Sequence, residues 1–165
     1  MNAESASIAV EVQVATAARP LPAAEDFCRW VRSALRGAGR VAETSTNVTV
    51  RIVDEAESQS LNSSFRDVAK PTNVLAFPVE ADSFPAHAED EAELGDLVIC
   101  AAVVTREAAG QAKPVEAHFA HMTVHGSLHL AGYDHLNDEQ AAEMESLEKQ
   151  ILAGLGFPDP YQQEH

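Results

Sequence analysis

The sequence contains few cysteines and no long apolar run, which argues against a disulfide-rich protein and against a membrane-spanning protein. The only two cysteines, Cys28 and Cys100, are far apart and form no CxxC pair, which predicts buried thiols in a reducing compartment. No apolar stretch approaches the length that crosses a membrane. The N-terminus carries Glu4 and no basic region of the kind that begins a signal peptide. We therefore expect a cytoplasmic protein with no membrane partner.

Basic residues are also scarce. The chain has 11 Lys and Arg residues against 26 Asp and Glu residues, which gives a formal net charge of −15. Because such a surface repels nucleic acid at long range, any nucleic-acid-binding site needs local positive charge. Hydrophobic residues nevertheless make up 45% of the 165 residues, enough for a core that does not depend on disulfides or metal.

Hydrophobic periodicity predicts one α+β domain over residues 1–165. Apolar patterns between turn residues predict strands at 8–14, 47–54, 71–78 and 94–100. Helical spacing predicts helices at 23–39, 55–66 and 101–111, a longer helix from Pro114, and a last helix from Asn137 to Gly156. The third and fourth strands are expected to pair antiparallel, because little but an acidic loop joins them. The expected fold is a small mixed sheet of about four strands packed with helices.

Two segments lack such a pattern. Residues 79–93 are acidic with little apolar periodicity, which predicts a mobile surface loop, and residues 157–165 are expected to form a loose tail. Two residues are predicted N-caps of helices: Asp54, and Asn137, which has Gln140 three residues later as in a capping box. The last helix is expected to bury Met144, Leu147, Ile151 and Leu155.

Four histidines follow one another at spacings of three, four and four residues. They fall on one stripe of the helix that starts at Pro114, and they are His118, His121, His125 and His129. A lone histidine on such a face is more often a satisfied core residue than a ligand. Four on one stripe indicate a shared role instead, because stacked imidazoles repel one another when they are charged.

The spacing of the last histidines predicts a metal site at the end of this long helix. His125 and His129 are one turn apart, so both imidazoles can reach one ion. Gly132 tolerates a positive φ and lets the chain leave the helix, and His135 can then return to the same ion. Three histidines without cysteine leave a fourth position for water, as in catalytic zinc sites. Zinc is favoured, although the spacing alone leaves other transition metals open.

Gly126 distinguishes this pattern from that of a peptidase. The zincin motif H-E-x-x-H-x-x-G-x-x-H has the same histidine and glycine offsets, but its general-base glutamate follows the first histidine, where this chain has Gly126. Asp134 neighbours the third histidine and is expected to orient the turn or a ligand imidazole rather than to replace that base. The residues therefore indicate a metal site of peptidase type without the peptidase base.

The stretch "HGSLHLAGYDH" at 125–135 resembles the signature of the YbeY family, the bacterial metallo-endoribonucleases of rRNA maturation. The stretches "LNSSFRDVAKPTNVLAFP" at 61–78 and "LGDLVIC" at 94–100 look like the second and third blocks of that family. Their order and spacing agree with the family, and a "MESLE" helix follows the metal motif. The resemblance covers the chain from about residue 50 to residue 155.

Two residues depart from the family pattern, and the ligand set does not. Asn73 and Ala76 stand where many members have aspartate and serine, which leaves the local hydrogen bonding at the third strand open. All three ligand histidines are present. The resemblance therefore implies one zinc ion held by His125, His129 and His135.

The resemblance also implies a functional arginine at Arg66. A guanidinium can clamp the anionic oxygens of a phosphodiester as charge builds in the transition state. From the residues alone, a surface arginine at a helix C-terminus would be the favoured interpretation. His121 is expected to act in catalysis, by donating to phosphate or shuttling a proton, although it could equally be a packed residue behind the metal. His118 is a weaker candidate for an orienting role.

The function implied by the resemblance is that of a zinc-dependent, single-strand-specific endoribonuclease. Its setting would be 16S rRNA 3′-end maturation and late-stage 70S ribosome quality control. The expected partners are rRNA, the small ribosomal subunit, and ribosomal or ribosome-assembly proteins. The expected nucleic-acid partner is RNA, and no DNA partner is expected. The acidic charge fits a substrate presented on a ribosomal particle, where zinc and Arg66 supply a small positive island. Two alternatives stay open: a metal-binding ribosome assembly factor without significant catalysis, and a zincin-like metallohydrolase acting on another substrate.

Overall fold

The computed structural model describes residues 8–39, 45–79, 91–134 and 136–161. Within these residues two strand–helix pairs are followed by two consecutive strands and then by three helices. The strands are β1 (Ile8–Ala15), β2 (Ser45–Val53), β3 (Val74–Pro78) and β4 (Glu91–Cys100). The helices are α1 (Ala24–Gly37), α2 (Glu55–Arg66), α3 (Ala101–Gly110), α4 (Val115–Leu130) and α5 (Asp138–Gly154). This arrangement confirms the expected α+β domain with a small mixed sheet.

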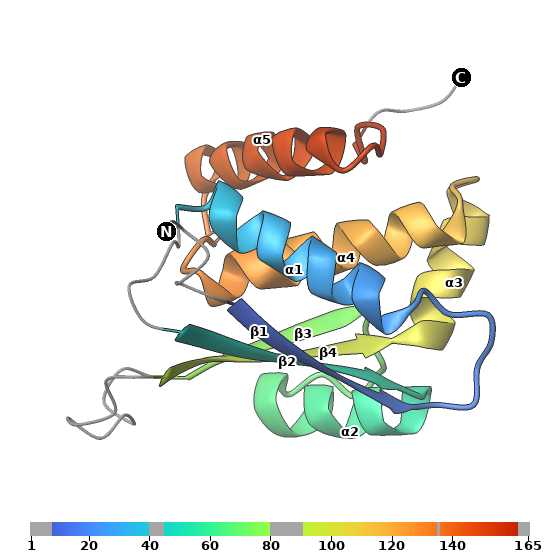
Figure 1. Cartoon of the computed structure of the whole chain (residues 1–165). Helices are drawn as coiled ribbons and strands as arrows, with labels where there is room; N and C mark the ends of the chain where they lie inside the picture. The colour runs from blue at the N-terminus through green and yellow to red at the C-terminus, as the bar shows by residue number, and fades with distance from the viewer. Residues whose placement is uncertain (1–7, 40–44, 80–90, 135, 162–165) are drawn as a thin grey trace.

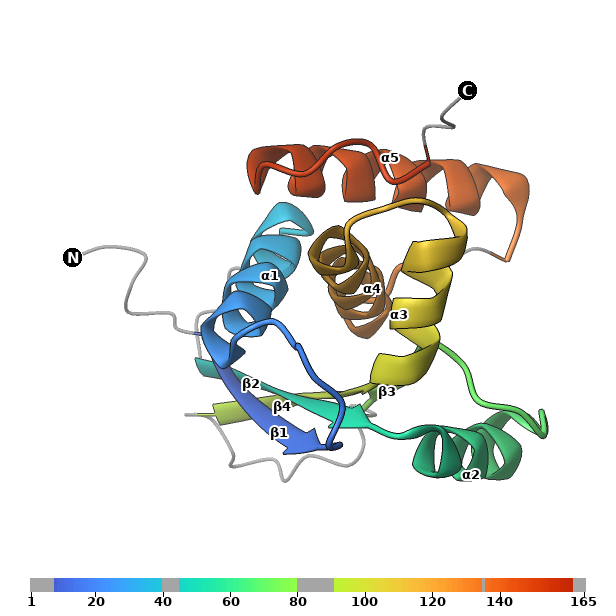
Figure 2. The same cartoon turned by 90° about the vertical axis from the view of Figure 1, so that its right-hand side faces the viewer.

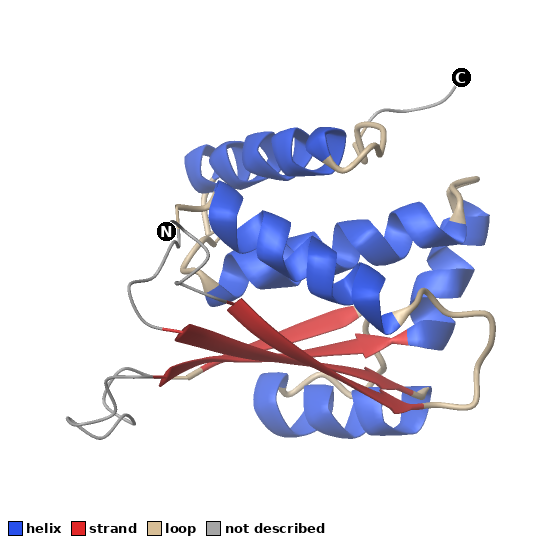
Figure 3. Ribbon diagram, viewed as in Figure 1, coloured by secondary structure: helices blue, strands red, loops and turns tan. Residues whose placement is uncertain are grey.

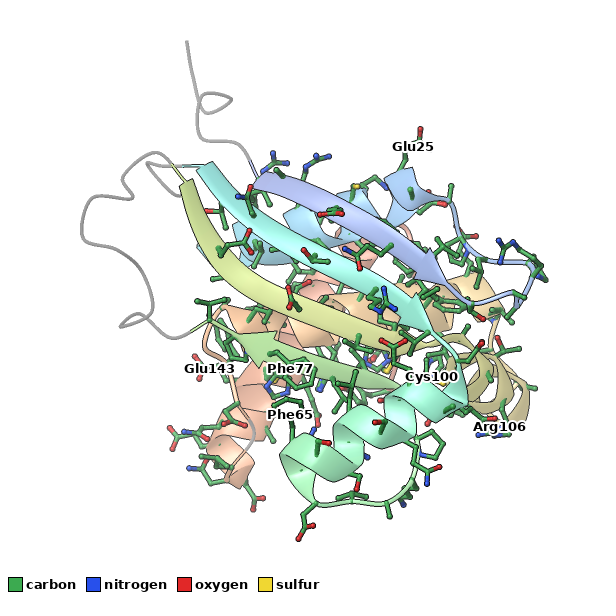
Figure 4. All side chains as sticks on the ribbon, turned by 90° about the horizontal axis from the view of Figure 1, so that it is seen from below. Glu25, Phe65, Phe77, Cys100, Arg106 and Glu143 are labelled. Atoms are coloured by element: carbon green, nitrogen blue, oxygen red, sulfur yellow. The ribbon has the colours of Figure 1, made fainter. Side chains whose placement is uncertain are left out.

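The four strands form one sheet in the order β1-β2-β4-β3. β1, β2 and β4 are parallel, and β3 pairs antiparallel with β4, as expected for the third and fourth strands. Helices α1 and α4 cover one face of the sheet, α5 lies over them as an outer layer, and α2 lies on the opposite side (Figure 1). Seen from below, α2 lies beside β3, near Cys100 at the end of β4, and leaves much of that face without a helix (Figure 4). Seen from the side, α4 lies between α1 and α3 and beneath α5 (Figure 2). Figure 3 shows the same layers by type of element.

The main core lies between the sheet and α1, α4 and α5. Trp30 anchors it and is fully buried, with its ring edge-on to Phe27 at 5.4 Å and to Phe157 at 6.0 Å between ring centroids. A second, smaller cluster lies on the other face of the sheet; its fully or nearly fully buried members are Val53, Leu75, Val98, Cys100 and Val103. Because α4 packs against several neighbouring elements, apolar residues occur almost all around it.

Gly126 brings α4 close to the sheet. A Cβ at this position would lie 2.8 Å from Leu97 Cδ2 and 3.1 Å from Val74 Cγ2, so a larger residue there would meet β4 and β3. The position that holds the glutamate of a zincin peptidase is therefore a packing position here. It lies against strands rather than toward open space.

The two expected N-caps differ in their contacts. The side chain of Asn137 accepts a hydrogen bond from the backbone N–H of Gln140 at 2.8 Å, which confirms the predicted cap of α5. The Gln140 side chain in turn accepts from the N–H of Leu136 at 3.0 Å. Asp54 occupies the N-cap position of α2, but its side chain makes no capping hydrogen bond and accepts instead from the hydroxyl of Thr16.

The segments expected to be irregular are partly described. Residues 80–90 of the acidic segment lie outside the described residues, whereas 91–93 belong to β4. Of the segment expected to be a loose tail, residues 157–161 are described and contact the rest of the domain. Within the described ranges, no helix is long and apolar enough to cross a membrane.

Candidate metal centre

The four histidines of α4 form a single row of rings. Neighbouring ring centroids lie 6.0 Å apart from His118 to His121, 6.3 Å from His121 to His125, and 4.8 Å from His125 to His129. His118 and His121 are 3% and 7% exposed, and the last two are half-buried. The row therefore runs from the interior toward the surface, and the two closest rings are those predicted to share a metal ion.

The chain turns sharply just after this pair. Gly132 has φ +107°, as its expected role at the helix end requires. Its N–H donates to the carbonyl of His129 at 3.0 Å, and the N–H of Tyr133 donates to the carbonyl of Leu128 at 3.0 Å. These two bonds form the Schellman ending of a helix, in which a glycine with positive φ closes the last turn. The turn therefore ends α4 one residue after His129, and His135 follows three residues after Gly132 in the sequence.

His135, the third predicted ligand, lies outside the described residues. Asp134 is exposed at the end of the turn. In the described part of the chain no three His, Cys, Asp or Glu side chains gather closely enough to hold a metal ion. The three-histidine site therefore stays a prediction, with two of its members placed side by side by the structure.

A buried acid, Glu148 of α5, stands directly behind the histidine row. It is 0% exposed, and its Oε2 is hydrogen-bonded to Nδ1 of His125. Its Oε1 lies 3.3 Å from Nε2 of His121 and accepts a hydrogen bond from the hydroxyl of Tyr161. Tyr161 Oη is also 3.3 Å from Nε2 of His121. A residue from α5 and one from the C-terminal segment thus meet two histidines of α4.

The ionisation of this group is set by two opposing effects. Burial alone raises the pKa of Glu148, but hydrogen bonds from His121, His125 and Tyr161 and the charge of His125 outweigh it, so the pKa falls to about 2. Burial and the bond to Glu148 both raise the pKa of Tyr161. Near neutral pH Glu148 is therefore a carboxylate that only accepts hydrogen bonds, and the Tyr161 hydroxyl is a donor.

Sequence reasoning missed Glu148 and Tyr161, although α5 carries a signal for the first. Met144 and Ile151 of α5 are buried as expected, and Leu147 and Leu155 are half-buried. Glu148 lies one turn after Met144 on the same apolar stripe. A carboxylate on a buried stripe needs a partner, because an unpaired buried charge is very costly. The sequence offers no comparable signal for Tyr161.

His118 belongs to a separate polar cluster at the start of α4. Its Nε2 lies 2.9 Å from Glu107 Oε1 of α3, and the Asn73 side chain donates to the same carboxylate at 3.1 Å. Asn73 directly precedes β3 rather than lying within it, and its Oδ1 accepts from the N–H of Val74 at 2.6 Å. The hydrogen bonding that the sequence left open at Asn73 is therefore satisfied, and it ties α3, α4 and β3 together.

Arg66 is the last residue of α2, on the face of the sheet opposite α4. Both helices run toward the same end of the molecule, so their C-terminal ends lie on the same side (Figure 1). Arg66 is exposed, and neighbouring Phe65 is 66% exposed, with its ring 5.1 Å from that of Phe77 on β3 (Figure 4). Arg66 therefore lies on the same side of the domain as the C-terminal end of α4, which carries His125 and His129, but on the other side of the sheet.

Buried polar groups of α2 fix the segment that follows Arg66. The Asn62 side chain donates to the carbonyl of Lys70 at 2.9 Å. The Ser58 hydroxyl donates to the carbonyl of Thr72 at 3.0 Å and accepts from its N–H at 2.9 Å. These bonds hold the approach to β3 against α2. The C-terminal end of α2 is therefore anchored relative to the sheet.

Two comparisons place the chain among known proteins. The family model described as "Endoribonuclease YbeY" matches residues 13–156. The solution structure of TM1509 from Thermotoga maritima, also described as VT1, a NESGC target protein, has a similar fold. Its TM-score is 0.52 at 20% sequence identity, over 93% of this chain and 99% of that chain.

Proposed function

Because the chain belongs to the endoribonuclease YbeY family, it is an endoribonuclease of rRNA maturation, and we propose that it is a zinc-dependent enzyme specific for single-stranded RNA. In this proposal it acts in the cytoplasm, in 16S rRNA 3′-end maturation and in late 70S ribosome quality control. The match over residues 13–156, which include the whole histidine row, is the observation that carries the proposal.

The proposed metal ligands are His125, His129 and His135. The donor set fits zinc, since imidazole nitrogen is a common zinc ligand and three histidines are a known catalytic combination. The fit is supported by the 4.8 Å separation of the His125 and His129 rings and by the turn at Gly132 that ends the helix just after them. Bound there, zinc would supply Lewis-acid polarisation of a phosphate oxygen.

Arg66 is proposed to bind the phosphate that reacts. Its guanidinium is exposed at the end of α2, where it can meet a ligand from solvent. Two parallel N–H donors suit two phosphate oxygens and stabilise the charge that builds there during cleavage. The anchored end of α2 would hold this arginine on the same side of the domain as the C-terminal end of α4 (Figure 1).

The other three predicted site residues, His121, His118 and Asp134, have different proposed roles. A catalytic role for His121 stays a prediction, and its burial beneath Tyr161 and Glu148 favours a role behind the metal ligands over contact with RNA. His118, held by Glu107, is proposed to position α4. Asp134 is proposed to orient the turn that carries His135.

The proposed substrate is rRNA presented on a ribosomal particle. A chain with net charge −15 repels free RNA at long range, so the affinity must come from local groups and from protein contacts on the particle. The small ribosomal subunit and ribosomal or assembly proteins are the partners that this proposal requires.

A cleavage assay on a single-stranded rRNA fragment tests the proposal. We compare the wild type with Arg66→Ala, His129→Ala and Arg36→Ala, using zinc-loaded protein and the same protein after chelation. Arg36 is a matched control, because it is also an exposed arginine in the last turn of a helix. Arg66→Ala should lower kcat about 100-fold, in the range for losing one group that stabilises transition-state charge.

The outcomes separate the rival functions. Chelation and His129→Ala should abolish cutting, and Arg36→Ala should leave it unchanged. Equal residual cutting by all four proteins would identify a contaminant and contradict the nuclease. RNA binding that depends on Arg66 without any cleavage would favour the assembly factor. Peptide hydrolysis lost only in His129→Ala would favour the zincin-like hydrolase.

A further inference from the structure

Glu148 is a fully buried carboxylate, and such a group is stable only if it is well paired. Transfer of an unpaired carboxylate into a protein interior is so costly that the group normally neutralises. Here His125, His121 and Tyr161 all contact it. Two of these contacts come from α4 and one comes from the C-terminal segment. The pairing explains how a charge is tolerated at the interface between α4 and α5.

The two carboxylate oxygens have different partners. Oε2 contacts Nδ1 of His125, whereas Oε1 contacts Nε2 of His121 and the hydroxyl of Tyr161. A carboxylate oxygen accepts hydrogen bonds, so this contact fits a His125 ring that carries its hydrogen on Nδ1. In a neutral imidazole with Nδ1 protonated, Nε2 carries the lone pair that can ligate a metal. The contact thus selects both the ring orientation and the ligating nitrogen of His125.

The C-terminal segment is held in place by bonds of its own. The Lys113 ammonium donates to the carbonyl of Pro160 at 2.6 Å, and the N–H of Tyr161 donates to Asp159 Oδ1 at 2.8 Å. Lys149 of α5 lies 3.8 Å from Asp159 Oδ2. The Tyr161 ring is edge-on to His121, with centroids 5.2 Å apart. The segment therefore holds the Tyr161 hydroxyl against Glu148 and His121.

We propose that Glu148 is a positioning residue that orients His125 for metal binding, and that Tyr161 holds Glu148 in place, so that the C-terminal segment is part of the metal site. Carboxylates that accept from a ligand histidine commonly fix its tautomer and raise its basicity. This inference rests on the proposed metal site, and it assigns a role to two residues outside the histidine motif.

The first test reads the His125 ring in the metal-free protein. Long-range 1H–15N correlation spectra at about pH 8 distinguish the two tautomers of a neutral imidazole. The wild type should show His125 with its hydrogen on Nδ1. In Glu148→Leu, which keeps bulk and removes both acceptors, this preference should be lost. A wild type with the hydrogen on Nε2, or an unchanged Nδ1 tautomer in a folded Glu148→Leu, would overturn the proposal.

The second test measures zinc affinity by competition with a chromophoric chelator. Glu148→Gln and Glu148→Leu should weaken zinc binding by roughly 10- to 100-fold, the usual loss when the partner of a ligand histidine is removed. Tyr161→Phe removes one hydroxyl from a partly exposed ring and should weaken binding by less than about tenfold. Glu143→Gln, an exposed acid on the same helix, is the matched control and should bind zinc as the wild type does.

The two variants at Glu148 and the one at Tyr161 keep the proposal testable if one of them fails to fold. Wild-type zinc affinity in both Glu148→Gln and Tyr161→Phe would overturn it, whatever happens to the free energy of unfolding. A wild type that binds no zinc would instead overturn the proposed metal site itself. Loss of zinc affinity with unchanged RNA cleavage would support the positioning role and contradict only the proposed use of zinc in catalysis.

Discussion

Replacing Gly126 by alanine tests how closely α4 approaches the sheet. A mid-helix Gly→Ala change by itself stabilises a helix by about 1 kcal/mol. Here the new Cβ would lie 2.8 Å from Leu97 Cδ2 and 3.1 Å from Val74 Cγ2, against an optimum of about 3.5–4.0 Å between carbon atoms. Leu97 is fully buried, so its methyl group has little space to move. Overpacking of this kind costs about 1–3 kcal/mol, and the net result should be a destabilisation of about 0–2 kcal/mol.

Urea denaturation of the metal-free protein, followed by circular dichroism, gives the difference in the free energy of unfolding. Gly110→Ala, at the last residue of α3, is the control, because apart from its chain neighbours and the backbone of its own helix no atom lies within 4 Å of a Cβ there. The control should gain up to about 1 kcal/mol from helix propensity. If Gly126→Ala gains as much as Gly110→Ala, α4 does not touch the sheet at this point, and the physical reason for a glycine in the motif is wrong.

Three further perturbations probe other parts of the account. Burial lowers the pKa of His118 despite Glu107, so the stability that neutral His118 contributes is present above about pH 6.5 and is lost as the pH falls through its folded pKa. In urea titrations between about pH 7 and pH 5, the unfolding free energy of His118→Gln should therefore depend less steeply on pH than that of the wild type. Equal slopes would contradict this. Asn137→Ala should cost about 1 kcal/mol in the same assay, because it removes the cap of α5, and no loss would show that the cap is not formed. Iodoacetamide should modify half-buried Cys28 before Cys100 in the native protein, because Cys100 is fully buried and its burial raises the pKa of its thiol. Mass spectrometry gives the order of modification. The reverse order would contradict the burial of Cys100 in the core.

Features of the fold that depend on local chemistry could be predicted from the sequence. Apolar alternation located the strands, and the short connection between β3 and β4 indicated their antiparallel pairing. Asn137 with Gln140 marked the start of α5, and Gly132 marked the end of α4, because a side-chain cap and a positive φ are local requirements.

Long-range contacts could not be predicted in the same way. The order β1-β2-β4-β3 depends on pairings between distant strands, and nothing in each strand's own pattern specifies its neighbour. Asp54 has the residue type and position of a cap, but Thr16, 38 residues earlier, engages its carboxylate instead.

The candidate site likewise has a part that follows from local sequence and a part that depends on long-range contacts. The spacing of the histidines places their rings in one row, since helical geometry alone determines it. The contacts behind that row come from elsewhere: Glu148 is 23 residues from His125, and Tyr161 is 40 residues from His121. Only the three-dimensional packing of α5 and the C-terminal segment against α4 brings these side chains together.

Metal analysis of the purified protein tests the central claim most directly. Elemental mass spectrometry on the wild type, His129→Ala and His135→Ala, with Glu143→Gln as the exposed control, gives the zinc bound per chain. We predict about one zinc ion per chain in the wild type and the control, with little or none in either histidine variant while both remain folded. Absence of metal from the wild type, or full zinc in both histidine variants, would contradict a metal site built on the end of α4.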